Sequence, residues 1–430
     1  MSGSGSLIDI EDSVFLGSVS NSGNSIIVTN GAKLIVGNGI DILGSNNTFS
    51  VADGGYLLVN NTFDASIEGF DFGEGGILET TGILSGMTNQ LSGNRTLKLT
   101  GASAEWTTGG PLMVDGGRIE ITEGGLLLSS NITINGSSQL LVSDDGSELN
   151  DQGTLVVGDG GDGSSVVVSN GALLTTVNAE IGKAGNNHGV LVDGTDSLWF
   201  NSEDIVLGGS GTGNWIEIRN NGQLMQGGTL NVLEGSALSI NSGGIVFTAD
   251  YYQDAASVLM FDSLATNTTL DTGPELILAT FDAEFEAGTT IRYTGEIADL
   301  GIGVTNSKKI VSADTLIVGG VTNASGTDLD VLNGPLSGVL LSMQFLSQDD
   351  DLYAQILRAR LADVAGFEDG SDMAGVSDGI DQLASDGNAA AVAQLDILTT
   401  LDGPAMNSEL TQLYDRSAPT YVHMEGMLEG

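Results

Sequence analysis

The feature that most constrains this chain is a repeat of short apolar strands separated by turns rich in glycine and asparagine. Leu155–Leu174 (LVVGDGGDGSSVVVSNGALL) and Ile205–Leu224 (IVLGGSGTGNWIEIRNNGQL) share this pattern and begin 50 residues apart, at positions 155 and 205. Gly101–Trp106 (GASAEW) and Gly194–Trp199 (GTDSLW) share a second signature, G-x-x-x-x-W. A period of this kind is typical of a solenoid, in which each repeat packs only against its neighbours.

Residues 7–240 consist almost entirely of short runs with strand character. Tyr56–Val59 (YLLV) and Arg118–Ile121 (RIEI) are examples, rich in branched apolar residues or alternating with polar ones. Turn dipeptides such as Asn30-Gly31 separate the runs, because asparagine and glycine tolerate the positive φ of tight turns.

These dipeptides also fit the hairpins of an antiparallel β-sandwich. However, the pattern continues through residues 7–240 without a helix signal or a domain linker, which favours stacked coils over a sandwich or a propeller. We therefore predict an all-β fold, a right-handed parallel β-helix with coils of about 20–25 residues.

The pattern changes twice beyond residue 240. Residues 241–350 keep strand patterns but hold more aromatic residues, which predicts a β-rich C-terminal cap over the open end of the β-helix. The spacing of apolar residues then predicts a short α-helical tail with helices in Leu352–Leu361, Ser377–Leu401 and Ala405–Tyr414. The expected organisation is an added Ser-Gly leader (1–6), β-helix repeats (7–240), a cap (241–350) and a helical linker (351–430).

Charge excludes several classes of partner. The chain has 56 Asp and Glu but only 12 Lys and Arg, a formal net charge of −44. Such a field repels nucleic acids and anionic lipids, so we expect neither nucleic acid nor a membrane as a direct partner. The absence of cysteine excludes disulfides, thiolate metal sites and cysteine nucleophiles. No apolar run reaches the roughly 18 residues of a transmembrane helix.

Three stretches resemble the passenger of a bacterial autotransporter, a protein of type V secretion. Ser169–Leu174 (SNGALL) and Ile181–Trp199 are similar to the passenger repeat of this family. Tyr251–Leu259 (YYQDAASVL) is similar to the Y-x-Q-x-x-x-S-x-L strand where the autochaperone segment begins, and Leu398–Leu413 resembles the segment before the translocator. The resemblance implies a β-helix outside a Gram-negative cell, anchored by an outer-membrane translocator β-barrel that this sequence lacks, and a role in adhesion or aggregation.

Residues for hydrolytic catalysis are scarce. His188 and His423 are the only histidines, and neither lies near a nucleophile motif, so nothing indicates a Ser-His-Asp triad or an H-E-x-x-H zinc site. A glycosidase stays open, because glycoside hydrolysis needs only two suitably separated carboxylates. Against a polysaccharide lyase, the basic residues of the rod form no cluster in the sequence: Lys33, Arg95, Lys98, Arg118, Lys183 and Arg219.

Calcium is the one ion that the sequence suggests, bound loosely rather than as a resident cofactor. Asp159 and Asp162 lie in a turn (GDGGDG) that resembles part of a calcium-binding β-roll, but Ser165 stands where that motif needs an aspartate. Asp349-Asp350-Asp351 is interpreted as a solvated loop.

Three tryptophans allow two interpretations. Exposed indole rings at Trp106, Trp199 and Trp215 would stack on sugars, whereas rings at repeat-linked positions would pack in the core. The shared spacing before Trp106 and Trp199 favours core positions.

The sequence thus predicts a non-catalytic, surface-exposed adhesin or self-association protein that acts through polar side chains along an acidic rod. The expected partners are a second copy of the chain or a surface receptor or glycan, and many weak contacts in register would add up. Because negative charge opposes association, cations should promote it. Two alternatives stay open: a carbohydrate-active β-helix enzyme, and a structural surface-layer or stalk protein.

Overall fold

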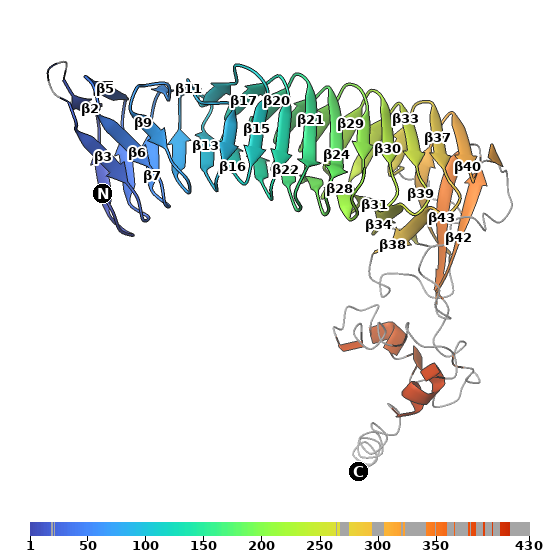
Figure 1. Cartoon of the computed structure of the whole chain (residues 1–430). Coiled ribbons are helices and arrows are strands. Elements are labelled where there is room, and N and C mark those ends of the chain that lie inside the picture. The colour runs from blue at the N-terminus through green and yellow to red at the C-terminus, as the bar shows by residue number, and fades with distance from the viewer. Residues whose placement is uncertain are drawn as a thin grey trace, which may run out of the picture.

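The computed structural model describes residues 1–263 except Val19 and Asn21, then 265–266, 275–294, 305–319, 321–322, 341–348 and 350–358, and further on 365, 377–378, 380–383, 390–391, 398 and 405–412. Up to residue 358, these residues form an elongated rod of stacked coils, from the blue N-terminal strands to the orange strands (Figure 1). The predicted parallel β-helix is therefore confirmed.

Three long sheets run along the rod, and within the described residues each coil contributes one strand to each sheet over most of its length. The first sheet has 13 strands: β1 (Leu7–Ile10), β4 (Lys33–Val36), β7 (Tyr56–Val59), β10 (Ile77–Thr80), β13 (Thr96–Thr100), β16 (Arg118–Thr122), β19 (Gln139–Ser143), β22 (Ser165–Ser169), β25 (Gly189–Asp193), β28 (Asn214–Arg219), β31 (Ser236–Ile240), β34 (Val258–Phe261) and β38 (Thr290–Tyr293).

The second described sheet has 14 strands: β8 (Phe63–Asp64), β11 (Ile83–Ser85), β14 (Glu105–Thr107), β17 (Leu126–Ser129), β20 (Glu148–Asp151), β23 (Leu173–Thr176), β26 (Leu198–Asn201), β29 (Gln223–Gln226), β32 (Ile245–Thr248), β36 (Ile277–Ala279), β39 (Thr305–Ser312), β43 (Asp351–Arg358) and β42 (Leu341–Gln348), with β35 (Ala265–Thr266) beside β39.

The third described sheet has 11 strands: β12 (Gln90–Ser92), β15 (Leu112–Asp115), β18 (Ile132–Asn135), β21 (Thr154–Asp159), β24 (Asn178–Ala184), β27 (Ile205–Leu207), β30 (Thr229–Val232), β33 (Asp250–Gln253), β37 (Asp282–Phe285), β40 (Thr315–Val318) and β41 (Val321–Thr322). The first coils add two short sheets: β2 (Val14–Gly17) with β5 (Ile40–Leu43), and β3 (Ser25–Val28) with β6 (Thr48–Val51) and β9 (Phe70–Phe72).

The sequence period corresponds to two coils. Leu155 pairs with Ala179 in the next coil, and Ala179 pairs with Ile205 in the coil after that. The 50-residue spacing is therefore one coil of 24 residues (155 to 179) plus one of 26 (179 to 205). Elsewhere in the described first sheet, paired residues of successive coils lie between 19 residues (77 to 96) and 32 residues (258 to 290) apart in the sequence. The coils therefore vary in length more than the expected range of about 20–25 residues.

Alternation along each strand builds the core. In β16, Ile119 and Ile121 are fully buried, while the residues between and beside them are partly exposed. The in-register partners of Ile119 are Leu97 and Leu140, which are also buried. Identical burial in successive coils produces continuous apolar ladders inside the rod, and each fully buried side chain contributes about 1.5–3 kcal/mol.

The two repeat-linked tryptophans occupy one such ladder. Trp106 on β14 pairs with Leu84 and Leu127, and Trp199 on β26 pairs with Leu174 and Leu224. Both indole rings are buried, and Nε1 of Trp199 donates a hydrogen bond to Oγ1 of Thr176 at 2.9 Å. The core interpretation of these two residues is confirmed.

The Asn-Gly dipeptides form corners between different sheets rather than hairpins. Asn30-Gly31 joins β3 to β4 with φ values of 55° and 75°, and Asn170-Gly171 joins β22 to β23 with 55° and 87°. Two successive residues in the left-handed region turn the chain sharply, and asparagine followed by glycine accepts that conformation at low cost.

Parallel stacking continues well beyond residue 240, through β34, β38 and β40. The pairing changes at the end of the second sheet, where β39 and β42 both lie antiparallel to β43. β39 itself pairs in parallel with β36, so β43 and β42 cover the edge of the last parallel strand of that sheet, β39.

The helix predicted for Leu352–Leu361 is wrong: residues 351–358 form β43. Leu352 and Ala354 are fully buried, and Tyr353 and Gln355 are buried as well, each 7% exposed. The apolar residues of this segment fit the spacing of a helix and also that of a strand. The strand forms because the open edge of β39 offers backbone hydrogen-bond partners along its length.

Helical residues occur further along the chain. Residues 405–412 form a helix inside the predicted Ala405–Tyr414 segment, and 377–378, 380–383, 390–391 and 398 are helical within Ser377–Leu401. The remaining residues of Ser377–Leu401 and of Ala405–Tyr414 lie outside the described residues. In the described part of the chain, no helix has the length and apolarity needed to span a bilayer.

Replacing Trp199 by alanine should destabilise the rod strongly, because it removes a fully buried indole and leaves a cavity. We expect a loss of about 3–5 kcal/mol. Phe200→Ala is the matched control, since Phe200 is the next residue on the same strand and is 42% exposed. Thermal unfolding followed by circular dichroism should show a much larger drop in Tm for Trp199→Ala; equal drops would contradict the core assignment.

Candidate interaction surface

Five neighbouring strands of the second sheet present an outward surface without charge. We call it the apolar face and define it by the outward-pointing side chains of β23, β26, β29, β32 and β36. These are Leu173, Thr175, Leu198, Phe200, Gln223, Met225, Ile245, Phe247 and Leu278. Among these described strand positions none is ionisable, although the chain carries a formal net charge of −44.

Register aligns the large apolar side chains into a column. Phe200 pairs with Met225, Met225 with Phe247, and Phe247 with Leu278, so four successive coils contribute one apolar residue each. Phe200 is 42% exposed and Met225 is 37% exposed. Phe247 and Leu278 are partly exposed, so the column is a contiguous outward apolar strip and a candidate interaction site.

The apolar face was not predicted from the sequence. The signal was present, because Phe200, Met225 and Phe247 each follow a buried core residue in a strand of their coil. However, the coils differ in length, so the three positions fall into line only when the strand register is known.

The first sheet, by contrast, carries ion pairs on its outer surface. Glu120 on β16 forms ion pairs with Nζ of Lys98 at 2.7 Å and with Nε of Arg118 at 2.6 Å. Burial acts to raise the pKa of Glu120, but these two cations outweigh it and lower the pKa. The expectation that the basic residues form no cluster is therefore wrong for Lys98 and Arg118, which stacking brings to one carboxylate.

Other basic residues of the rod are also matched to carboxylates. Arg219 lies 2.9 Å from Asp193 and 3.3 Å from Glu217, and its hydrogen bond lowers the pKa of Asp193. Lys183 lies 3.0 Å from Glu180. These pairs are substantially exposed, so solvent screens them and each adds little to stability. In these pairs each positive charge is neutralised by a neighbouring carboxylate, so they do not form a basic surface.

Of the two candidate calcium ligands, Asp159 ends β21 and Asp162 lies in the turn before β22, and both contact the next coil. Asp159 is 3.9 Å from Nζ of Lys183. Asp162 accepts the backbone N–H of Asn186 at 2.7 Å and its Nδ2 at 3.1 Å. Among the described residues, no three His, Cys, Asp or Glu side chains gather closely enough to hold a metal ion. The carboxylates of Asp159 and Asp162 connect coils in this geometry.

Two residues of the acidic run are described: Asp350 in the turn before β43, and Asp351 as the first residue of that strand. Asp350 has a positive φ of 64°. Asp351 forms an ion pair with Lys309 at 2.9 Å and accepts the hydroxyl of Tyr353 at 3.0 Å, so it is not a freely solvated residue. Asp349 lies outside the described residues.

His188 is a buried structural residue. Its Nδ1 accepts the backbone N–H of Ser164 at 3.1 Å, and its Nε2 lies 3.1 Å from the carbonyl oxygen of Gly161. Since Nδ1 accepts, the ring carries its proton on Nε2 and donates to Gly161. The backbone N–H of His188 donates in turn to Oδ1 of Asn214 at 3.0 Å. The ring thereby connects neighbouring coils. His423 lies outside the described residues.

Trp215 differs from the other two tryptophans. It is partly exposed on the outside of the first sheet and covers Gly189, where a Cβ atom would lie 2.1 Å from Cε2 of the indole. Trp215 is therefore neither a core residue nor a free platform, because one ring face rests on the neighbouring strand.

Asp151 is a carboxylic acid buried inside the rod. Asp151 has no exposed surface, and its two carboxylate oxygens accept the backbone N–H groups of Ile132 at 3.1 Å and Gly153 at 3.2 Å. Burial raises the pKa of Asp151 to about 6, although both hydrogen bonds act in the opposite direction.

This shifted pKa predicts a pH-dependent contribution to stability. As pH rises from about 4, the unfolded chain loses the Asp151 proton first, because its pKa there is near 3.8. The free energy of unfolding therefore falls by about 3 kcal/mol between pH 4 and about 6 and stays lower above that range. In Asp151→Asn this fall is absent.

The measurement is the Tm of Asp151→Asn minus that of the wild type, taken between about pH 4 and about pH 7.5. We expect this difference to increase with pH. Asp145→Asn, at an exposed turn position, is the control and should give a constant difference. A pH-independent difference for Asp151→Asn would rule out the raised pKa.

No protein family model, curated protein or solved structure matches this chain. The fold is therefore assigned from strand pairing alone. The resemblance to autotransporter passengers rests on the residues that suggested it, and the β-solenoid architecture is consistent with it.

Proposed function

We propose that this chain is a non-catalytic, surface-exposed autotransporter passenger that acts as an adhesin or self-association protein through the side of its β-helix. The proposed location is the cell surface, with attachment through a translocator β-barrel that is not part of this sequence. The observation that carries the proposal is the apolar face, and above all the column from Phe200 to Leu278.

The partner that best fits the apolar face is a second copy of this chain. Most of the molecular surface is acidic, so two copies repel each other wherever charged sides meet. The described strand positions of the apolar face carry no charge, which makes it the side along which repulsion is weakest. Two such β-sheet faces pack about 10 Å apart with interlocking side chains.

This arrangement changes the expected chemistry of association. The sequence predicted association through polar side chains along the rod. The outward column instead consists of apolar residues: Phe200, Met225, Phe247 and Leu278. Apolar burial supplies the attraction in this proposal, and screening of the remaining charge by salt permits close approach. Association should therefore strengthen as ionic strength rises.

Phe200→Lys should weaken self-association of the purified chain. The substitution makes the net charge less negative, so general repulsion would decrease, but it places an unpaired charge in the contact. We expect association weakened about tenfold or more. The measurement is sedimentation velocity at about 0.05 M and about 0.5 M NaCl, which shortens the range of repulsion several-fold.

Asn231→Lys is the matched control, because it adds the same charge at an outward position of β30 on the third sheet. It should associate as well as the wild type. A wild type that stays monomeric at both salt concentrations, or a Phe200→Lys variant that associates normally, would refute the proposal. Clumping of cells that display the wild type but not Phe200→Lys would extend the result to the cell surface.

A further inference from the structure

A break in strand pairing lies near the N-terminal end of the rod. The third side of the rod is continuous except between β9 and β12, which belong to neighbouring coils but to different sheets. The two coils are joined on either side of the break, by Ala65 N–H to the Ser85 carbonyl at 2.8 Å and by Gly75 N–H to the Gly93 carbonyl at 2.9 Å. Between these points the coils separate and enclose a cavity.

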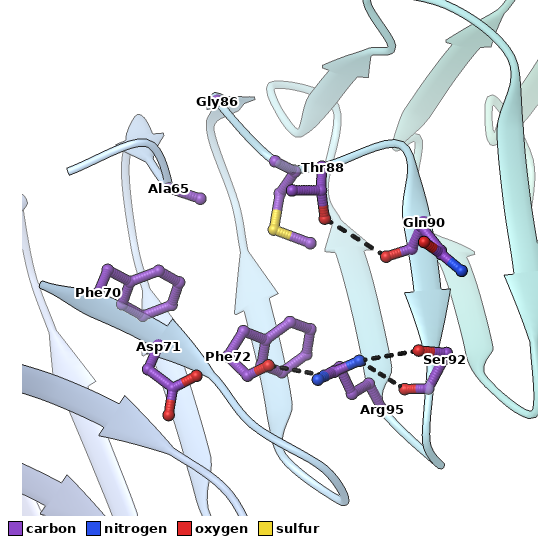
Figure 2. A pocket seen from close by; sticks show the side chains of 10 residues that line it. Ala65, Phe70, Asp71, Phe72, Gly86, Thr88, Gln90, Ser92 and Arg95 are labelled. Carbon is purple, nitrogen blue, oxygen red and sulfur yellow. Dashed lines mark hydrogen bonds between the residues drawn. The ribbon is translucent and has the colours of Figure 1, made fainter. Parts of the chain in front are cut away.

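Arg95 spans the break, as Figure 2 shows. Its Nε donates to the carbonyl oxygen of Phe72 on β9 at 2.6 Å. Its Nη1 donates to the carbonyl oxygen of Ser92 on β12 at 2.9 Å and to the Ser92 hydroxyl at 3.1 Å. A guanidinium group therefore replaces backbone pairing here, while none of the described residues accepts a hydrogen bond from Nη2.

The cavity has a volume of about 380 Å³. Its inner wall is apolar, because Phe70, Phe72 and Met87 are partly buried and pack against the core. Phe70 is held in place by Phe63, with ring centroids 4.9 Å apart. This size falls at the small end of ligand sites, which are typically about 300–1,000 Å³.

The outer rim of the cavity is polar. Asp71, Thr88 and Gln90 are exposed and line it together with Arg95. The rim thus offers a carboxylate and an amide oxygen as acceptors, and an amide nitrogen and Nη2 of Arg95 as donors, while the Thr88 hydroxyl already donates to the carbonyl oxygen of Gln90 at 3.4 Å. A ligand with both an apolar group and several hydroxyl groups would satisfy this combination.

We propose that the cavity binds a neutral sugar residue that carries an N-acetyl group. The acetyl methyl group fits the apolar wall formed by Phe70, Phe72 and Met87, and the acetamido oxygen accepts from Nη2 of Arg95. The sugar hydroxyls donate to Asp71 and exchange hydrogen bonds with Gln90. Neutrality matters, because the net charge of −44 repels an acidic sugar and Asp71 adds to that repulsion.

This site is separate from the apolar face, and the inference does not depend on self-association. The cavity lies on β9 and β12, whereas the apolar face extends over β23 to β36. Variants of one surface leave the other intact, so the two proposals fail or succeed independently.

The test is saturation-transfer difference NMR on the full chain, with N-acetylglucosamine, glucose and glucuronic acid as probes at equal concentration. We expect transfer to N-acetylglucosamine, strongest at its acetyl methyl group, and far weaker transfer to the other two sugars. Equal transfer to glucose, stronger transfer to glucuronic acid, or none to N-acetylglucosamine would overturn the proposal.

Two substitutions at exposed rim positions locate the site. Asp71→Ala and Gln90→Ala should each weaken N-acetylglucosamine binding about three- to tenfold, the loss expected for one or two hydrogen bonds. Met113→Ala and Asp115→Ala are matched controls on β15, where Met113 is the in-register partner of Gln90 and Asp115 that of Ser92. Binding that is unchanged in both rim variants, or reduced equally in the controls, would refute this site. Unchanged Tm values establish that all four variants remain folded.

Discussion

Everything in this molecule depends on the parallel hydrogen-bonded ladder between successive coils. Each coil is too small to bury its own apolar residues, so it is stable only when its strands pair with those above and below. The ladder fixes the register, and the register decides which side chains form columns. Trp199 is placed in the core and Phe200 on the outside because the ladder holds β26 between β23 and β29.

The same ladder explains how one chain carries a large negative charge and an uncharged face together. On the first sheet, stacking brings Lys98 and Arg118 to Glu120, so part of the charge is balanced across coils. On the second sheet, the outward positions from Leu173 to Leu278 contain no ionisable side chain among the described strands. In the proposed association, repulsion keeps charged surfaces apart and copies meet through this uncharged side.

Much of the fold was predictable because its determinants are local. Alternating apolar residues and Asn-Gly corners specify strands and turns, and the spacing before Trp106 and Trp199 identified equivalent core positions. What depends on contacts between distant segments was not predictable. The strand at 351–358 forms because β39 offers an edge. The ring of Trp215, which strand alternation points outward, rests on the neighbouring coil because Gly189 has no side chain there.

The same distinction applies to the two candidate sites. The apolar face requires the register of coils with unequal lengths, and the cavity requires the missing pairing between β9 and β12. Asp159 and Asp162 were chosen for a local motif, but their carboxylates contact Lys183 and Asn186 in the next coil. In a solenoid, chemistry arises between coils, so single stretches of sequence reveal little of it.

The central claim, that copies meet through the apolar face, is tested most directly by site-specific cross-linking. The chain has no cysteine, so a single Thr175→Cys places one thiol on the apolar face, and Thr133→Cys places one on the third sheet. Under mild oxidation at high salt, the account predicts rapid disulfide-linked dimers for Thr175→Cys and few for Thr133→Cys. Equal yields from both positions, or more from Thr133→Cys, would contradict it.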